Sequence, residues 1–476
     1  MLRYVIKRLL LFLPTLLVIS FFAFGLSRCT PGDPIQCYLP SSIDGKFSIS
    51  PDQYERAYRR KAVELGWNKP PFYFAITSAA YPDTLHRVLI RDQRKCLKKL
   101  TAQSGNWPLT EHYYQQIGLV HREILGVPDS LNSDALIRIR SIPGQLYQEY
   151  EPVVIRSLLD TLQHFSSRDQ YLSTHILATA QELDQRFRQW QDHPRRHLLY
   201  LPAVHWYGAD NQYQHWLGNF LTGNLGRSCK DGRPIFGKIT DHLRWTLLIN
   251  GLAILIAYLL SVPLGVYAAF HKGGRLDRIS TFILFLLYSL PNFWVATLLV
   301  IFFTNPTYGM DWFPATGLGN LSPSVPFRKQ FWDVALHLVL PVFSLAYGTL
   351  AFISRQMRAS VLEVINTDYI RTARAKGVPE KEVIWKHSFR NALFPLITLF
   401  ANIFPALLAG SIVIERVFNI PGMGLLLIDS INSKDWQVVY AILMIAAVVT
   451  ILGILLADLL YAWIDPRVKF EKSKTR

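Results

Sequence analysis

Apolar residues along this chain gather into long blocks that polar segments separate. An α-helix needs about 20 predominantly apolar residues to cross the hydrocarbon core of a bilayer. Six blocks are close to or above that length and contain no Asp, Glu, Lys or Arg: 9–27, 245–270, 279–304, 334–354, 391–414 and 436–457. Backbone groups in hydrocarbon must be bonded within their own segment, so each block is predicted to be one transmembrane helix.

Prolines lie inside five of these blocks, namely Pro14, Pro263, Pro291, Pro341 and Pro405. In a helix that water surrounds, an internal proline costs about 3 kcal/mol. In a membrane bundle the neighbouring helices can bond the carbonyl groups that proline frees. Continuous helices are therefore still expected at all five positions.

The first block also resembles a signal peptide, even a lipoprotein signal that ends at Cys29. Its apolar run of 19 residues is longer than the roughly 7–15 residues of a signal core. Arg28 also stands where lipoprotein cleavage requires a small residue. We therefore expect residues 1–30 to form an uncleaved N-terminal transmembrane helix.

Residues 31–240 form a long polar region between the first and second blocks. Three apolar stripes with helical spacing run through it. The first consists of Leu172, Ile176, Ala180, Leu183, Phe187 and Trp190. The second is Val154, Leu158, Leu162 and Phe165, and the third, with Thr110 as its N-cap, is Tyr113, Ile117, Val120 and Ile124. Amphipathic helices bury such stripes against one another, so a compact helical domain is predicted at about 78–205.

The net charge of +16 would suit nucleic-acid binding, but its placement favours a different explanation. The basic clusters precede the first block, separate the second from the third and the fourth from the fifth, and follow the sixth. In a six-span chain these positions share one side, and the opposite short loops are poorer in Lys and Arg. That asymmetry places both termini in the cytoplasm. No basic module with interleaved aromatics and no zinc spacing appears, so no nucleic-acid partner is expected.

Other chemistry-bearing patterns are weak. Residues 232–240, GRPIFGKIT, nearly match a phosphate-binding loop, but Ile239 replaces the hydroxyl that holds Mg²⁺ and a membrane span follows. The four cysteines, Cys29, Cys37, Cys96 and Cys229, lie on the external side and allow free thiols or a disulfide whose pairing the sequence does not choose. No metal site and no catalytic motif is predicted.

The spans carry no ionisable residue near their centres, which argues against a carrier driven by protons or sodium. Asn292, beside Pro291, is the most notable polar residue in a span. It is predicted either to line a translocation path or to bond a neighbouring carbonyl group. Any transport must therefore take its energy from a partner.

The cytoplasmic loop at about 355–390 is the strongest local signal. Asn366 or Thr367 is suited to cap a short helix at about 368–376, and Gly377 is suited to end it. Pro379 is suited to open a second helix, since its missing N–H does no harm in the first turn. Composition alone leaves protein docking and lipid contact equally open for this basic helix.

The segment RTARAKGVPEKEVIWKHSFRNALFP, residues 371–395, resembles the coupling loop of permeases of bacterial ABC importers. It is closest to the dipeptide, oligopeptide and nickel branch, and within it to the first, or B-type, permease. The other segments that resemble this branch are 2–34 with its PGDP exit, 223–228, 261–278, 289–296 and 415–436.

The resemblance implies a type I permease fold of six transmembrane helices, all-α, in the bacterial inner membrane. It implies a heterodimer with a second permease, two separate ATPase subunits that bind ATP and Mg²⁺, and an extracytoplasmic solute-binding protein. This chain would bind no cofactor, catalyse no reaction and move di- or oligopeptides. Docking to an ATPase is assigned by resemblance to Arg371, Thr372, Ala373, Arg374, Ala375, Lys376 and Gly377.

Two departures and two alternatives accompany this resemblance. The general coupling pattern has Glu-Ala at positions 371–372, whereas this chain has Arg-Thr. Relatives usually have only a short segment where the domain at about 78–205 is inserted, between residues 31 and 240. That domain would stabilise the permease core at 241–476, contact the binding protein or shield the entrance. The alternatives are the same machinery for nickel or another small solute, and a membrane-anchored receptor or scaffold.

Overall fold

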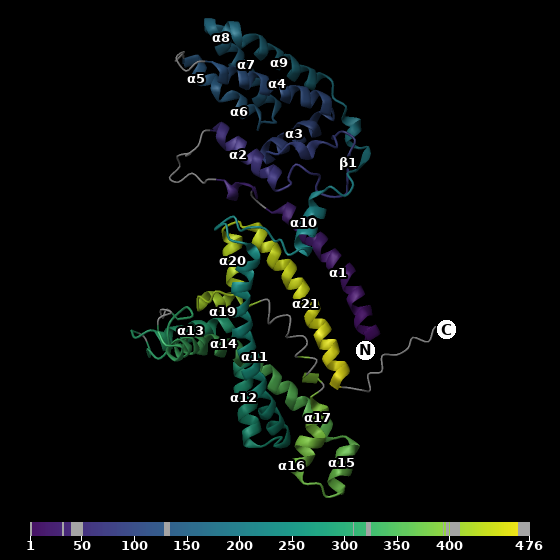
Figure 1. Cartoon of the computed structure of the whole chain (residues 1–476), viewed down its shortest axis with the longest axis vertical. Coiled ribbons are helices and arrows are strands. Elements are labelled where there is room, and N and C mark those ends of the chain that lie inside the picture. The colour runs from purple at the N-terminus through teal and green to yellow at the C-terminus, as the bar shows by residue number, and fades with distance from the viewer. Residues whose placement is uncertain are drawn as a thin grey trace, which may run out of the picture. The chain divides into compact units, whose positions relative to one another are not determined.

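The computed structural model describes residues 2–30, 33–39, 51–127, 134–307, 309–319, 325–393, 395, 396, 399 and 410–464. The chain divides into two compact units. Met1–Gly32 and Gly223–Arg476 form one, here called the membrane unit, and Asp33–Thr222 form the other, here called the interspan unit. Figure 1 draws both, coloured along the chain.

Within the described residues of the membrane unit, four helices are long and apolar enough to cross a bilayer. They are α1 (Leu2–Cys29), α11 (Ile235–Phe270), α14 (Phe327–Ile365) and α21 (Trp436–Ile464). These helices contain the predicted blocks 9–27, 245–270, 334–354 and 436–457, so those four predictions are confirmed. Pro14, Pro263 and Pro341 all lie inside continuous helices, as expected.

The third predicted block, 279–304, is not one helix. It is divided into α12 (Arg275–Ser289) and α13 (Asn292–Thr304), which meet at 95°. Pro291 precedes α13 with extended backbone, and Leu290 before it is extended too. Proline disfavours helical backbone in the residue before it. The Tyr347 hydroxyl donates to the Leu290 carbonyl at 2.8 Å, so a neighbouring helix stabilises the break rather than repairing a continuous helix.

The fifth predicted block, 391–414, lies mostly outside the described residues, as does Pro405. Its described ends belong to α17 (Phe389–Ala392) and α19 (Ile412–Val417). The structure also describes, in this unit, α15 (Asp368–Ala375), α16 (Glu380–Glu382), a π-helical turn η5 (Val383–Ser388) and α20 (Met423–Asn432). Figure 1 shows α15, α16 and α17 grouped at one end of this unit.

Small residues bring α11 and α14 together. Along α11 the buried positions recur every four residues: Ile249, Ala253, Ala257, Ser261, Gly265 and Ala269. A Cβ on Gly265 would lie 2.6 Å from the Ser354 carbonyl oxygen and 2.7 Å from Met357 Cβ on α14. Small residues at such spacing let helix backbones approach closely in a membrane, where burying leucine gains little.

The interspan unit is mainly helical. It contains α2 (Pro51–Glu64), α3 (Arg91–Ser104), α4 (Trp107–Gly126), α5 (Asp134–Arg140), α6 (Ile142–Leu146), α7 (Pro152–Arg168), α8 (Gln170–His175), α9 (Leu177–Asp192) and α10 (Gln212–Leu221). Short 3₁₀ turns are η1 (Gln36–Tyr38), η3 (Leu85–Arg87) and η4 (Arg196–Leu199). One hydrophobic core spans α3 to α9.

Two of the three predicted stripes are confirmed, because all residues of the first and third are at most 3% exposed. The second is right in part. Leu162 is fully buried as predicted, and Leu158 and Phe165 pack against the core, but Ile155 and Leu159 are buried where Val154 is 41% exposed. The predicted N-cap Thr110 is also wrong. The helix that carries the third stripe, α4, begins about a turn earlier, at Trp107. The buried Thr110 hydroxyl donates to the Asn106 carbonyl and accepts from Trp190 Nε1.

The interspan unit also contains a β-ribbon that an all-α prediction omits. Strand β1 (Phe74–Ser78) pairs antiparallel with β2 (Pro202–Trp206), in a register that opposes Ser78 to Pro202. The strands thus bracket residues 79–201, close to the limits predicted for the insertion. Long-range pairing of this kind leaves little trace in local sequence, since each strand has only five residues.

Candidate functional site

Helix α15 (Asp368–Ala375) carries five of the seven residues that resemble the docking motif, and a glycine turn ends it. Gly377 has a φ of +74°, a conformation that side chains disfavour. Its N–H donates to the Arg374 carbonyl at 3.0 Å, and the Val378 N–H donates to the Ala373 carbonyl at 3.3 Å. These two bonds define a Schellman motif, which satisfies the last carbonyl groups of the helix. The predicted helix and its end at Gly377 are confirmed.

The motif presents a largely open surface. Arg371, Thr372, Arg374, Ala375, Lys376 and Gly377 are exposed, and Ala373 is half-buried. The Arg371 guanidinium pairs with Asp368 at 3.4 Å within the helix, where both side chains are mostly in solvent. An exposed pair of this kind contributes little to stability. The small side chains on this surface leave room for a partner to approach the backbone of α15.

The opposite side of α15 is anchored. Ile370 and Val383 are fully buried, and the Asn391 side chain donates to the Tyr369 hydroxyl at 2.6 Å. Across the glycine turn, Arg374 Nη2 pairs with Glu380 Oε1 at 2.6 Å. The exposed helix is therefore attached at three points to the segment that follows it.

That following segment is not the regular helix that the sequence predicts. It passes from α16 through the π-turn η5 into α17. The hydrophobic cluster beneath it joins Ala392 of α17 to Met357 and Val361 of α14, with Ile384 and Phe389 packed against it. A π-turn rotates the side chains beyond it, which explains why a single helical period fails here.

Asn292 is the first residue of α13 and lies at the 95° break. It is exposed, and a Cβ on Gly348 of α14 would lie 3.5 Å from Asn292 Oδ1. Asn292 belongs to a different element from the seven docking residues, which lie at 371–377. Its predicted place on a translocation path stays a prediction.

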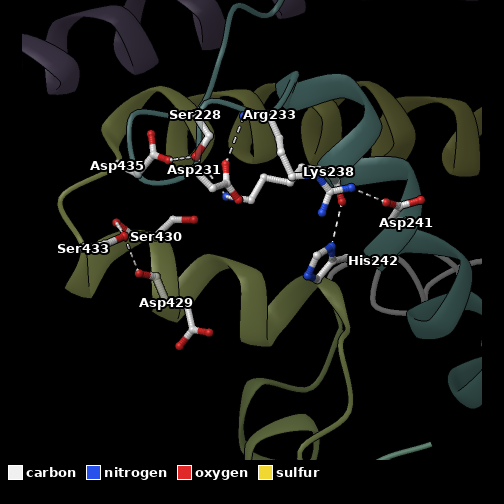
Figure 2. A network of polar contacts seen from close by, with 10 residues as sticks. All are labelled: Ser228, Asp231, Arg233, Lys238, Asp241, His242, Asp429, Ser430, Ser433 and Asp435. Atoms are coloured by element: carbon white, nitrogen blue, oxygen red, sulfur yellow. Dashed lines mark hydrogen bonds and ion pairs between the residues drawn. The ribbon is translucent and has the colours of Figure 1, made fainter. Parts of the chain in front are cut away.

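A second polar assembly, which the sequence did not reveal, joins the start of α11 to the start of α21 (Figure 2). Ser228 and Asp435, each 1% exposed, lie 2.5 Å apart through their hydroxyl and carboxylate oxygens. Lys238 Nζ donates to Ser228 Oγ at 2.9 Å and pairs with Asp231 Oδ2 at 2.9 Å. The Ser228 hydroxyl therefore accepts from the ammonium and donates to Asp435.

Residues 232–240, which nearly match a phosphate-binding loop, contribute Lys238 to this assembly. Lys238 is the lysine of the near-match, and its side chain is 8% exposed and engaged by Asp231 and Ser228. Residues from Ile235 onward already belong to the long helix α11. A lysine that is held by a carboxylate in this way is a structural cation, which agrees with the rejection of a phosphate site.

Contacts to this cation change the acidity of Asp231. Partial burial alone would raise the pKa of the Asp231 carboxyl, but hydrogen bonds from Lys238 Nζ and the Arg233 N–H, together with the charge of Lys238, outweigh burial and lower that pKa. Opposite charge and hydrogen bonds to the ionised form both favour the carboxylate. By contrast, Arg233 pairs with Asp241 at 3.0 Å where both side chains are about half exposed.

Glu415 is a buried carboxylate whose hydrogen bonds are all from neutral donors in the described chain. It accepts from the Thr246 hydroxyl at 3.0 Å and from the Leu425 N–H at 2.9 Å. A Cβ on Gly410 or Gly422 would overlap its carboxylate oxygens. The signal in the sequence is a glutamate close to three glycines, but nothing local shows that they fold around it.

Of the cysteines, Cys29 is an exposed free thiol and Cys96 a buried one. Burial raises the pKa of the Cys96 thiol to about 12, and its S–H donates to the Glu149 carbonyl at 3.1 Å. Among the described residues, no three His, Cys, Asp or Glu side chains are grouped to hold a metal ion.

Residues 261–470 match the family of binding-protein-dependent transport system inner membrane components. The chain is 38% identical over 260 residues to the oligopeptide transport system permease protein AppB of Bacillus subtilis (strain 168), covering 54% of this chain and 80% of that protein. The chain belongs to this family of permeases. It is also 33% identical to the dipeptide transport system permease protein DppB of Escherichia coli (strain K12), over 59% of this chain and 87% of that protein.

Membership in this family confirms the predicted fold, membrane location and branch. The permease has the type I fold, is a component of the inner membrane and lies in the B-type, dipeptide and oligopeptide branch. A further DppB, from Lactococcus lactis, is 34% identical over 56% of this chain. The permease works with ATPase and binding-protein subunits and is itself a transporter component, not the ATPase.

Proposed function

We propose that this permease forms part of a peptide importer and receives the work of ATP hydrolysis through α15. Its cargo is di- or oligopeptides, by analogy with its relatives AppB and DppB, which are an oligopeptide and a dipeptide transport system permease. The single observation that supports coupling is the construction of α15, which is exposed on one side and anchored on the other. A helix that only held the topology would need neither feature.

The proposed assembly contains a second permease, two ATPase subunits and an extracytoplasmic binding protein. Only 17% of the most apolar window of α1 and 22% of that of α11 is buried within this chain. Spans with this much uncovered surface need lipid or a partner permease around them. Both termini are proposed to face the cytoplasm, because the basic loops gather on that side.

Force would pass from α15 to the spans in two steps. Arg374 and Tyr369 first connect α15 to Glu380 and Asn391, and the hydrophobic cluster then connects α17 to α14. Since packed interfaces shift between discrete arrangements, displacement of α15 would be transmitted to α14 as a rigid movement. ATP and Mg²⁺ would bind on the ATPase subunits.

Replacing Gly377 with valine tests the proposal. A β-branched residue at φ +74° is strained, so the Schellman motif should open and the end of α15 should shift. We expect peptide uptake by the reconstituted importer to fall at least tenfold, about 1.4 kcal/mol of lost coupling. ATP hydrolysis should lose its dependence on peptide-loaded binding protein.

The matched control is Gly66→Val in the interspan unit, where φ is +73° and no atom lies within 4 Å of the added Cβ. It introduces the same backbone strain in the unit that does not contain α15 and should leave the coupling of uptake to hydrolysis intact. Normal coupling in the Gly377→Val importer would reject α15 as the coupling element.

A further inference from the structure

A pocket of about 490 Å³ lies between α12 and α14, at the polar end of the broken span. It is lined by Asp277, Arg278, Thr281, Phe282, Phe285 and Arg358. Neither the seven docking residues at 371–377 nor the network around Lys238 contributes to it. Its lining combines two guanidinium groups with two aromatic rings, which is unusual for a surface that only packs against another helix.

One wall of the pocket is fixed by a bidentate ion pair. Arg358 Nε and Nη2 donate to the two carboxylate oxygens of Asp277 at 2.8 and 2.9 Å. The Asp277 side chain is 5% exposed and also accepts from the Gly273 N–H at 2.9 Å. A planar fork held in this way has a fixed orientation. Arg358 is therefore positioned, while Asp277 neutralises its charge.

The second arginine is different. Arg278 is exposed, and it makes no ion pair with any residue that the structure describes. With Arg358 balanced by Asp277, the pocket carries one net positive charge from Arg278. Lys272 and Arg275 are exposed nearby and add to the positive potential. The pocket therefore favours an anion.

The other end of the pocket is apolar and open. Phe282 is 67% and Phe285 60% exposed, and they follow Arg278 by roughly one and two helical turns. Ile279 and Leu286 on the same helix are more than half exposed. A soluble anion would gain nothing from this aromatic surface. An amphiphile would place its charged group at Arg278 and its chains along the phenylalanines.

We propose that this pocket binds the phosphoryl headgroup of an anionic phospholipid. Arg278 would contact the phosphate, the Asp277–Arg358 pair would form the wall beside it, and the acyl chains would lie over Phe282 and Phe285. Basic pockets at the ends of transmembrane helices are suited to such headgroups. The inference rests on the membrane location of the family and not on the proposed role of α15.

Lipid bound in this pocket would be connected to α15 through helix α14. Arg358 lies on the same helix, α14, whose end at Ile365 precedes α15. A headgroup at Arg278 would screen that arginine from Arg358 and strengthen the grip of Asp277 on α14. Transport should then be faster in bilayers that contain anionic lipid, without any change in the ATPase subunits.

The test compares two arginine variants of the complete importer. Arg278→Gln removes the unpaired charge in the pocket, whereas Arg275→Gln removes another exposed arginine of the same helix that does not line the pocket. Each complex is placed in nanodiscs of phosphatidylcholine with a minor fraction of phosphatidylglycerol, and the lipid retained after mild delipidation is counted by native mass spectrometry. Arg278→Gln should lower phosphatidylglycerol retention roughly fivefold, the effect of one arginine at an anionic surface. Arg275→Gln should change it less.

Further experiments distinguish a lipid headgroup from free phosphate and from a protein occupant. Inorganic phosphate at millimolar concentration should not displace the retained lipid, and displacement would reveal a soluble-anion site and overturn the proposal. Equal retention in both variants would overturn it as well. A crosslink between a Phe285→Cys variant and the second permease would show that a protein occupies the pocket, and it would also overturn the proposal. If Arg278→Gln fails to assemble, the competition between inorganic phosphate and lipid on the unsubstituted complex still tests the proposal, because displacement would overturn it.

Discussion

The interspan unit and the membrane unit use apolar residues in opposite ways. In the interspan unit the large side chains are inside: Tyr113, Ile117 and Phe187 are fully buried. In the membrane unit large side chains point outward, as with Leu255 and Leu259 of α11, which are 61% and 69% exposed. The buried stripe of α11 is formed largely by alanine, serine and glycine.

The difference follows from the solvent. Water drives large apolar groups together because burying each one stabilises the fold by about 1.5–3 kcal/mol. Lipid is as apolar as leucine, so helices associate there through close packing and hydrogen bonds. A hydrophobic pattern therefore predicts the core in one unit and the outer surface in the other. Four predictions test this contrast, from the largest expected effect to the smallest.

Substituting Gly265 with leucine should have the largest effect. The added Cβ alone would clash with backbone atoms of Ser354 and with Met357, which cannot move aside without separating α11 from α14. We expect destabilisation of about 3 kcal/mol or more, the upper end for overpacking. The yield of monodisperse permease in mild detergent would measure it. Gly251→Leu on the same helix, where nothing lies within 4 Å of the added Cβ, is the control. Equal yields would refute close packing of α11 and α14.

Shortening one buried and one exposed side chain compares the units directly. Ile117→Ala removes atoms from a core position that is 0% exposed and should cost about 3 kcal/mol. Leu259→Ala removes similar atoms from a surface that is 69% exposed and should cost under about 0.5 kcal/mol. Thermal unfolding, followed by limited proteolysis, would measure the stability of each unit separately. A large loss from Leu259→Ala would mean that a partner permease covers this face.

The third prediction concerns acid stability. The pKa of Asp231 is lowered in the folded state, so its contribution is complete above the unfolded value of about 3.9 and is lost as pH falls through the lower folded pKa. Lys238→Met should cost about 2 kcal/mol near neutral pH. It should also move the acid loss to higher pH, because the pKa of Asp231 rises without the ammonium.

Arg233→Met is the matched control, because it breaks an ion pair whose side chains are 57% and 47% exposed. It should cost under about 0.5 kcal/mol and leave the acid transition unchanged. Unfolding temperatures measured from neutral to acidic pH would separate the two variants. An unshifted acid transition in Lys238→Met would show that the cation does not control Asp231.

The smallest effect should appear in thiol labelling, which does not perturb the fold. Cys29 at the end of α1 is exposed, whereas Cys96 is buried and burial raises the pKa of its thiol to about 12. Only the thiolate reacts readily, so a maleimide should modify Cys29 within minutes and Cys96 only after unfolding. Peptide mapping by mass spectrometry would read both positions. Early modification of Cys96 would contradict the closed core of the interspan unit.

Much of the local structure is readable from the sequence. Gly377 ends α15 because few other residues adopt positive φ, and Pro379 precedes α16 because its missing N–H is harmless there. Two of the three interspan stripes name their buried residues correctly. Pro291 shows the limit. Pro263 and Pro341 lie in continuous helices, whereas Pro291 divides its span, and nothing in the local sequence distinguishes the three.

The sequence by itself determined where four of the long apolar helices lie, which loops are basic and which helix resembles a docking element, because these depend on short-range composition and period. Tertiary structure decided that Lys238 meets Ser228 and Asp231 beside Asp435, that Asp277 holds Arg358, and that three glycines surround Glu415. Such pairs join residues up to 207 positions apart. The energy of a buried polar group depends on partners that only folding brings within 3 Å, and no local pattern records them.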